Sequence, residues 1–341
     1  LIAGSQDNCT FYKNNAEEWI NVTNGDGMEC MIHPDNTNII YASNQFGYLY
    51  KSLNGGQNMS NILTYGIVQQ EGTGVWITPF QMDQQAPSTI YGGFKNLWRS
   101  DQGGSGWYKI SNFANMPGYG YPKPIWDFEL APGNPNIIYV SKQPFPVAGY
   151  QFSGEMWKTT DGGQNWINIS SGLPLYYNYP NDIAITEDLN IAYISLIGFQ
   201  DGYKVFRTIN GGQSWENISG NLPNIPVTSI VYQLGSAKHD VYIGTDLGVY
   251  HFNDDYTDWH LFSDNLPNVV INELQIDYNE SRLYAATYGR GIWMVDLLNP
   301  VTGFSEQDSA FENSEIQLSP NPAIDQLNID VHTSFRGVAQ L

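Results

Sequence analysis

The chain has 341 residues, with 34 Asp and Glu against 14 Lys and Arg, which gives a formal charge of −20 at pH 7. This excess of negative charge argues against binding to nucleic acids or anionic membrane surfaces, because their phosphates would be repelled. Aromatic residues make up 14% of the chain and no apolar run reaches about 18 residues, so the sequence predicts a large buried core and no membrane span.

Strand signals begin at the first residues and continue to about residue 296. Leu1 to Gly4 already has the pattern of a strand, and neither an initiator Met nor a signal peptide precedes it. We therefore expect the chain to begin within a larger protein. Helical periodicity is nowhere convincing. Runs rich in β-branched and aromatic residues are bounded by Gly, Asn and Pro, and they recur in units of four strands.

Each unit is expected to contain a first, innermost strand, followed by second, third and fourth strands. Five units are complete between about residues 26 and 263. Residues 1–23 supply only the second to fourth strands of a unit, and residues 271–296 supply only the first to third. The predicted first strands are 28–32, 75–80, 125–130, 182–185, 228–232 and 271–276.

A short box joins the third and fourth strands of each unit. Its clearest copies are Thr159 to Trp166 and Thr208 to Trp215. Asp or Asn suits such a turn because its side chain accepts backbone N–H groups, and the glycines that follow adopt positive φ at little cost. The Trp is expected to pack on the hairpin that it closes. We assign the box a structural role, carried by Asn54, Gln102, Asp161, Trp166, Asn210 and Trp215.

Four short strands repeated in this way predict an all-β fold, a β-propeller of four-stranded antiparallel blades. This chain would hold five complete blades and two partial ones. Either further blades precede it, giving seven or more in the full protein, or residues 1–14 lie outside a six-bladed ring. The predicted domains are the propeller at 1–297, a linker at 298–315 and the start of a C-terminal domain at 316–341.

The boxes and strands over residues 1–296 resemble the Asp-box propellers, which include sialidases, sortilin ectodomains and xyloglucanase-type glycoside hydrolases. The segments 6–8, 24–27 and 286–293 look most like the sortilin and xyloglucanase branch. A sialidase would need three arginines around its substrate, and only Arg290 is placed like a site residue. A xyloglucanase would carry an acid in an Asp-x-Gly-Gly loop, which residues 43–47 and 245–248 do not match. The scaffold hosts both enzymes and receptors, so the resemblance indicates fold rather than function.

The segment after Leu297 changes character. A polar linker leads to Leu318-Ser319-Pro320-Asn321-Pro322-Ala323 and then to Leu327-Asn328-Ile329. This resembles the opening of a type IX secretion sorting domain, cut short at Leu341. The resemblance implies cargo of the type IX secretion machinery, secreted or displayed on the outer-membrane surface of a Gram-negative bacterium. An ordinary linker followed by a strand is the alternative.

Acidic residues are predicted at one end of the propeller channel. Alignment of the first strands places six residues at equivalent positions: Glu29, Pro79, Asp127, Asp182, Ser229 and Glu273. Converging carboxylates raise one another's pKa. They can therefore serve as general acid and base, with Asp127, Asp182 and Glu273 as catalytic candidates, or they can bind Ca²⁺. Alternatively, they only line a water-filled channel.

The loops at the same end, here called the mouth face, supply candidate ligand contacts. Their exposed rings would stack on sugars, or would pack on one another. Besides Glu29, the candidate ligand-binding residues are Asp7, Asp26, Tyr121, Tyr150, Tyr177, Tyr179, Tyr288 and Arg290. Cys9 and Cys30 are the only cysteines. They either form a disulfide or remain free, with Cys30 as a small buried side chain.

Because no complete catalytic motif is present, the sequence favours a non-catalytic module that binds a glycan or protein, or mediates adhesion. The alternative is a xyloglucanase-like glycoside hydrolase that uses the acids of the channel mouth. A third possibility is a structural cargo domain.

Overall fold

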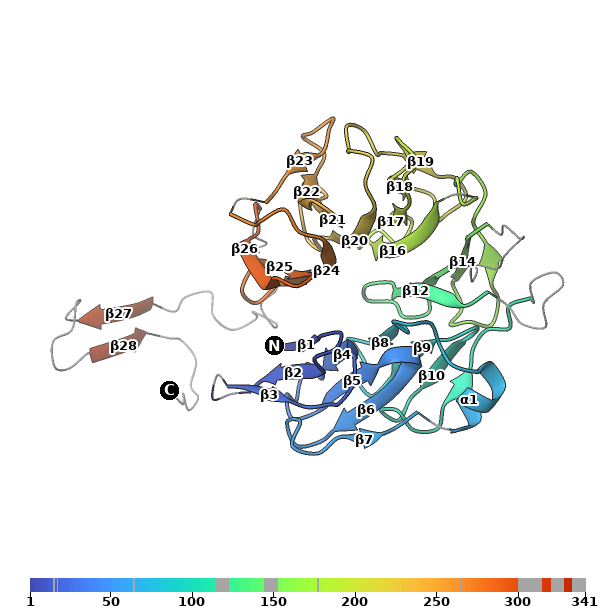
Figure 1. Ribbon diagram of the computed structural model, residues 1–341. Helices are drawn as coiled ribbons and strands as arrows, with labels where there is room; N and C mark the ends of the chain where they lie inside the picture. The colour runs from blue at the N-terminus through green and yellow to red at the C-terminus, as the bar shows by residue number, and fades with distance from the viewer. Residues whose placement is uncertain are drawn as a thin grey trace.

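The computed structural model describes residues 1–299 except 15, 17, 64, 115–122, 144–152, 177 and 264, and also the strands at 315–319 and 328–332. Seven antiparallel sheets follow one another around a central axis and form a β-propeller (Figure 1). The all-β prediction is confirmed, with one correction. A seven-residue helix, α1 (Tyr65–Glu71), lies between the second and third sheets and was not predicted. No helix in the described part of the chain is long and apolar enough to cross a membrane.

The partial first and last blades are confirmed as three-stranded sheets, and the five sheets between them have four strands each. The first sheet contains β1 (Ile2–Gly4), β2 (Thr10–Lys13) and β3 (Trp19–Asn21). The last contains β24 (Ile271–Asp277), β25 (Arg282–Thr287) and β26 (Gly291–Asp296). β1 lies beside β4, the innermost strand of the next sheet. Residues 1–14 therefore pack in the propeller, and the expectation that they lie outside a six-bladed ring is wrong.

The five complete blades run from innermost to outermost strand in chain order. Their bounds are β4 (Gly27–Ile32), β5 (Ile40–Asn44), β6 (Tyr48–Ser52), β7 (Ser60–Asn61); β8 (Phe80–Met82), β9 (Ile90–Gly93), β10 (Leu97–Ser100), β11 (Tyr108–Lys109); β12 (Ile125–Leu130), β13 (Ile138–Lys142), β14 (Glu155–Thr159), β15 (Ile167–Asn168); β16 (Tyr179–Ile185), β17 (Ala192–Ile197), β18 (Val205–Thr208), β19 (Glu216–Asn217); β20 (Val227–Tyr232), β21 (Val241–Thr245), β22 (Gly248–Phe252), β23 (His260–Leu261). In the C-terminal segment, β27 (Glu315–Ser319) pairs with β28 (Asn328–His332).

The hydrophobic core lies between blades. The second strands of the complete blades are buried along most or all of their length, because a neighbouring blade covers each of their faces, and they are mainly apolar. One core cluster joins Tyr139 and Met156 of one blade to Ile183 and Ile194 of the next. Neighbouring blades therefore stabilise each other mainly by apolar burial, at about 25 cal/mol per Å².

The boxes form the turns between third and fourth strands, on the face opposite the channel mouth. Asp161 Oδ1 accepts hydrogen bonds from the Thr159 hydroxyl at 2.8 Å and from the Asn165 backbone N–H at 2.8 Å. The box Trp was expected only to pack on its own hairpin, but it also contacts the preceding blade. Trp166 Nε1 donates to Gly163 O and also to Ile110 O in the preceding blade, at 3.0 Å. Each such Trp therefore ties two blades together.

Basic residues on the third strands make a second tie between blades. Lys158 Nζ lies 4.7 Å from the centre of the Tyr139 ring and donates to Gly211 O in the next box at 3.2 Å. Lys51 makes the same pair of contacts with Tyr41 and Gly103 O. These cations occupy structural positions.

Candidate functional site: acids in the propeller channel

The innermost strands share an irregularity at the mouth of the channel. The register shifts by a β-bulge near the start of β4, β12, β16, β20 and β24. Bulges turn side chains away from the regular pleat. Just after the bulge, Asp127 pairs with Ser141, Ser229 with Gly244 and Glu273 with Ala286. The sequence alignment of these three channel positions therefore agrees with the register of the sheets.

The third sheet departs from the predicted strand bounds. Its innermost strand was expected at 75–80, whereas β8 begins at Phe80. Pro79 has no N–H with which to continue a ladder, although its carbonyl still accepts a hydrogen bond from Gly93 at 2.9 Å. Residues 72–79 instead belong to the loop that leads from α1 to β8.

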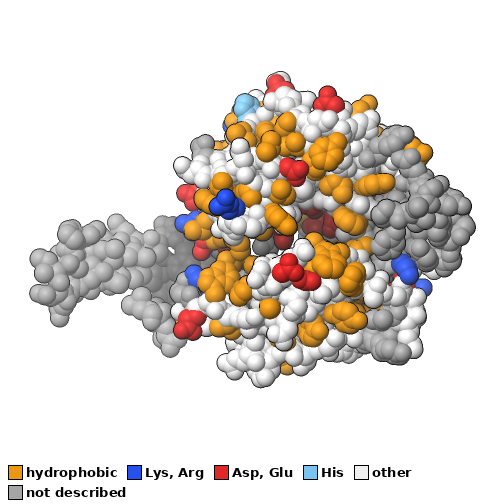
Figure 2. Space-filling view, in the orientation of Figure 1, with side chains coloured by type: hydrophobic (Ala, Val, Ile, Leu, Met, Phe, Trp, Pro, Cys, Tyr) orange, Lys and Arg blue, Asp and Glu red, His pale blue; other side chains and the backbone are white. Residues whose placement is uncertain are grey.

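Five carboxylates from four blades converge on the channel: Glu29, Asp127, Glu129, Asp182 and Glu273. Figure 2 shows hydrophobic side chains around a central hollow, with acidic side chains visible inside it. Glu129 was not predicted. Its position two residues after Asp127 on one strand was the available signal, since alternate residues of a strand share a face.

Burial raises the pKa of all five acids, and repulsion from neighbouring acids adds to the effect for all but Asp182. The pKa of Glu29 rises to about 8 through burial and the charges of Glu273 and Asp182. The pKa of Glu129 also rises to about 8, mainly through burial. Those of Asp182 and Glu273 rise less, to about 6. Protein surrounds the channel, but water reaches it. Glu273 is exposed and the others are half-buried, so solvent screens part of the repulsion.

Asp182 belongs to a repeated contact between innermost strands. Asp182 Oδ2 accepts hydrogen bonds from Ser229 Oγ at 2.9 Å and from Ile230 N at 2.7 Å in the next blade. In the same way, Ser229 Oγ accepts the Leu274 N–H at 3.1 Å. Hydrogen bonds to the ionised form of a carboxyl favour that form. They explain why the pKa of Asp182 is raised less than those of Glu29 and Glu129.

Asp127 lacks the corresponding partner. In the repeat it would accept the N–H of Ile183, but Asp182 Oδ1 accepts that N–H at 2.8 Å. Asp127 Oδ2 is consequently buried with no hydrogen-bond partner among the described residues. Burial, followed by the charges of Asp182 and Glu129, raises the pKa of Asp127 well above its ordinary value. Asp127 and Asp182 therefore lie in contrasting environments on neighbouring blades, with Asp127 favouring the protonated form.

Glu129 has a partner that Asp127 does not. Gln81 Nε2 donates to Glu129 Oε2 at 2.6 Å, while Gln81 Oε1 accepts the Leu130 N–H at 2.9 Å. This glutamine thus links the third and fourth sheets at the channel wall. Glu129 therefore lies in the same channel and is held by Gln81. Asp127 differs because its Oδ2 has no hydrogen-bond partner among the described residues.

The remaining predicted ligand contacts are only partly brought together. The Asp7 N–H donates to Asp26 Oδ1 at 2.7 Å, so these two acids share one corner of the mouth face. Tyr288 and Arg290 are exposed in the turn between β25 and β26. Tyr179, predicted in a loop, lies in β16 opposite Ile197. Tyr121, Tyr150 and Tyr177 lie outside the described residues.

The cysteines are both free thiols, so of the two alternatives the structure has the reduced one. Burial beside Glu273 and Glu29 raises the pKa of the Cys30 thiol. Within the described residues, no three His, Cys, Asp or Glu side chains are arranged to hold a metal ion.

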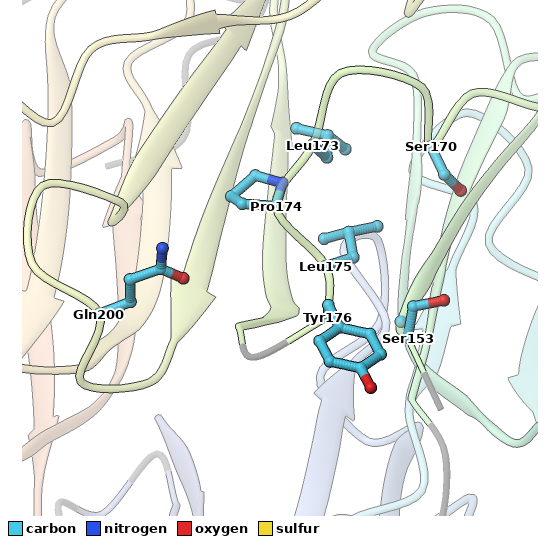
Figure 3. A pocket seen from close by; sticks show the side chains of 8 residues that line it. Ser153, Ser170, Leu173, Pro174, Leu175, Tyr176 and Gln200 are labelled. Carbon is cyan, nitrogen blue, oxygen red and sulfur yellow. The ribbon is translucent and has the colours of Figure 1, made fainter. Parts of the chain in front are cut away.

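A shallow pocket of about 330 Å³ opens on the mouth face between the fourth and fifth blades. Figure 3 shows Gln200 on one side of the segment Leu173–Tyr176, and Ser153 and Ser170 on the other. Gln200 Oε1 accepts a hydrogen bond from the buried Asn178 at 2.7 Å, which fixes that wall. The pocket is lined by Ser153, Gly154, Ser170, Leu173, Pro174, Leu175, Tyr176 and Gln200.

Comparison with known proteins finds sequence similarity to a xyloglucanase and structural similarity to GH74 enzymes. A xyloglucanase of Hypocrea jecorina is 29% identical over 178 residues, which is 46% of this chain and 20% of that protein. The GH74 enzyme of Niastella koreensis has a TM-score of 0.60 at 15% identity over 88% of this chain and 50% of its own. An ancestral GH74 enzyme gives 0.56 at 16% identity, over 80% and 38%.

The same fold also appears outside this class. YCF48 from Cyanidioschyzon merolae has a TM-score of 0.53 at 13% identity, over 81% of this chain and 83% of that one. No protein-family model matches the chain. The structural matches show the propeller fold, and the chain spans half or less of the xyloglucanase and GH74 proteins that it resembles.

Proposed function

We propose that this propeller belongs to a glycoside hydrolase that acts on a neutral, xyloglucan-like polysaccharide at the channel mouth. This replaces the non-catalytic module that the sequence favoured. The observation that carries the proposal is the contrast between Asp127 and Asp182. Asp127 has a buried oxygen without a hydrogen-bond partner among the described residues, and its pKa is strongly raised. Asp182 accepts hydrogen bonds that favour its ionised form.

This contrast suits the chemistry of glycosidic cleavage. The reaction needs one protonated carboxyl that donates to the leaving oxygen and one ionised carboxylate that activates water or attacks the sugar. Two carboxyls whose environments separate their pKa values can take these two roles at the same pH. We assign Asp127 as general acid and Asp182 as base or nucleophile. The likeness to a xyloglucanase supports the substrate class.

The proposal is tested by measuring the reducing ends released from xyloglucan by the purified chain. We expect Asp127→Asn and Asp182→Asn each to lower the rate at least 100-fold, since general acid–base catalysis contributes about 10²–10⁴-fold. Asp35→Asn, an exposed acid on the opposite face, is the matched control and should retain the wild-type rate. Equal rates in all three variants would contradict the assignment.

A non-catalytic glycan-binding module is the second candidate. It is favoured by the two inter-strand hydrogen bonds of Asp182, which already give this acid a structural role. Binding of xyloglucan without any release of reducing ends would support this candidate and exclude the first.

We further propose that the C-terminal segment directs export by the type IX secretion machinery to the surface of a Gram-negative cell. The proposal is supported by the Leu318-to-Ala323 motif, whose first residues end β27. Deletion of residues 315–341 from the full protein should cause its retention inside the producing cell. Unchanged export of the deleted protein would contradict this proposal.

A further inference from the structure

Two aromatic side chains form an exposed corner on the mouth face. Phe46 lies in the turn between β5 and β6, and Trp76 lies in the loop between α1 and β8 of the next blade. Their ring centres are 5.2 Å apart and the rings are perpendicular. Each residue nevertheless keeps 41% of its surface exposed. Tyr48 and Ile77 beside them in sequence are exposed as well.

The backbone holds Phe46 in an unfavourable conformation. Its φ of 65° lies in the left-handed region, which is uncommon for residues other than glycine and strained for a bulky one. Two hydrogen bonds fix it there: Phe46 N to Trp76 O at 3.1 Å, and Gly74 N to Phe46 O at 3.0 Å. A glycine at position 46 would adopt the same φ with less strain.

The adjoining residues make the corner rigid. Gly47 has φ of 86°, and a Cβ there would come within 2.9 Å of Thr78 Oγ1. Thr78 is fully buried and its hydroxyl donates to Val75 O at 2.8 Å. The hydrogen bonds and close contacts thus hold the two loops together. A strained, rigid and exposed aromatic pair contributes little to the core. Strained residues and exposed apolar patches often mark binding sites, so we infer a binding role for this pair.

We propose that the Phe46–Trp76 corner is a stacking platform for one pyranose ring of a neutral polysaccharide. A pyranose presents an apolar face of C–H groups, and an exposed aromatic ring buries that face without needing a charged partner. The net charge of −20 disfavours polyanionic ligands at the same surface. The corner lies on the mouth face, the face at which the channel acids are also found. The choice of a glucan as ligand rests on the proposed function.

The test is calorimetric titration of a xyloglucan heptasaccharide into the full chain and its variants. Phe46→Gly should weaken binding about tenfold while the thermal midpoint stays the same or rises, because the strain is relieved. Trp76→Ala should weaken binding by a similar factor. Trp19→Ala is the control, since Trp19 is 49% exposed on the outer strand β3, away from the mouth. Its affinity should equal that of the wild type.

The outcomes separate this proposal from the hydrolase assignment. Three results would each overturn the platform. They are undiminished binding by Phe46→Gly and Trp76→Ala, an equal loss of binding in Trp19→Ala, and no binding by the wild type. Weakened binding in the two corner variants, in a chain that never releases reducing ends, would uphold the platform and reject the hydrolase.

Discussion

At the scale of single residues, the five channel acids show how position changes one functional group. Asp182 accepts hydrogen bonds from the neighbouring blade, and Glu129 accepts one from Gln81. Asp127 Oδ2 has no hydrogen-bond partner among the described residues. The repeat explains the difference, because the donor expected for Asp127 is used by Asp182 instead. A site that departs from its own repeat is a reasonable place to look for function.

Stability measurements should separate Asp182 from Asp127. Asp182→Ala removes the acceptor of Ser229 and of the Ile230 N–H, so the free energy of unfolding should fall by about 1–3 kcal/mol. Asp127→Ala removes a carboxyl that has one unpartnered oxygen and lies near other acids, so stability should stay the same or rise. Urea denaturation of both variants measures this. A larger loss for Asp127→Ala would refute the hydrogen-bond argument.

At the scale of elements, the boxes and the bulges lie on opposite faces of the propeller and have different roles. The boxes tie blades together on one face, whereas the bulged starts of the innermost strands deliver acids to the other. The sequence repeat predicted the blades and the partial ends, and its alignment of Asp127, Ser229 and Glu273 agrees with the sheet register, because periodic patterns report backbone pairing directly.

Other features escaped prediction for physical reasons. Helix α1 has only seven residues, too few for a periodic signal. The apolar residues Val75 and Trp76 suggested a strand, but they lie in the loop before β8. The hydrogen bonds that separate Asp127 from Asp182 depend on contacts between blades, which a single sequence does not reveal.

Two glycine substitutions test how the boxes connect blades. Gly172 has φ of 87° and open space around a would-be Cβ among the described residues, so Gly172→Ala should cost about 1 kcal/mol from backbone strain alone. Gly163 has φ of 94°, but its Cβ would lie 2.5 Å from Ile110 O in the preceding blade. Gly163→Ala should therefore cost about 2–4 kcal/mol. Equal unfolding midpoints for the two variants would argue against this inter-blade contact.

At the scale of the whole molecule, the acids link the stability of the propeller to pH. Their pKa values in the folded state lie above those of the unfolded chain, so the folded state binds more protons between about pH 4 and 8. Stability contributed by these groups is therefore present at low pH and is lost as pH rises through about 6 to 8. This direction is opposite to that of a carboxylate held in an ion pair.

The thermal midpoint should accordingly fall between pH 5 and 8.5, and Glu29→Gln should flatten this fall. General repulsion from the net charge of −20 acts in the same direction, but added salt screens it at the surface. The dependence that remains in 0.5 M NaCl measures the channel. A midpoint that rises with pH in that salt would rule out raised pKa values for these acids.

The pH dependence of kcat/KM for xyloglucan hydrolysis, in the wild type and in Asp127→Asn, tests the central claim most directly. We expect a bell-shaped profile, with a lower limb near pH 6 as Asp182 ionises and an upper limb as Asp127 loses its proton. Asp127→Asn should remove the upper limb and most of the rate. A chain with no hydrolytic activity, or a variant whose profile matches the wild type, would contradict the claim.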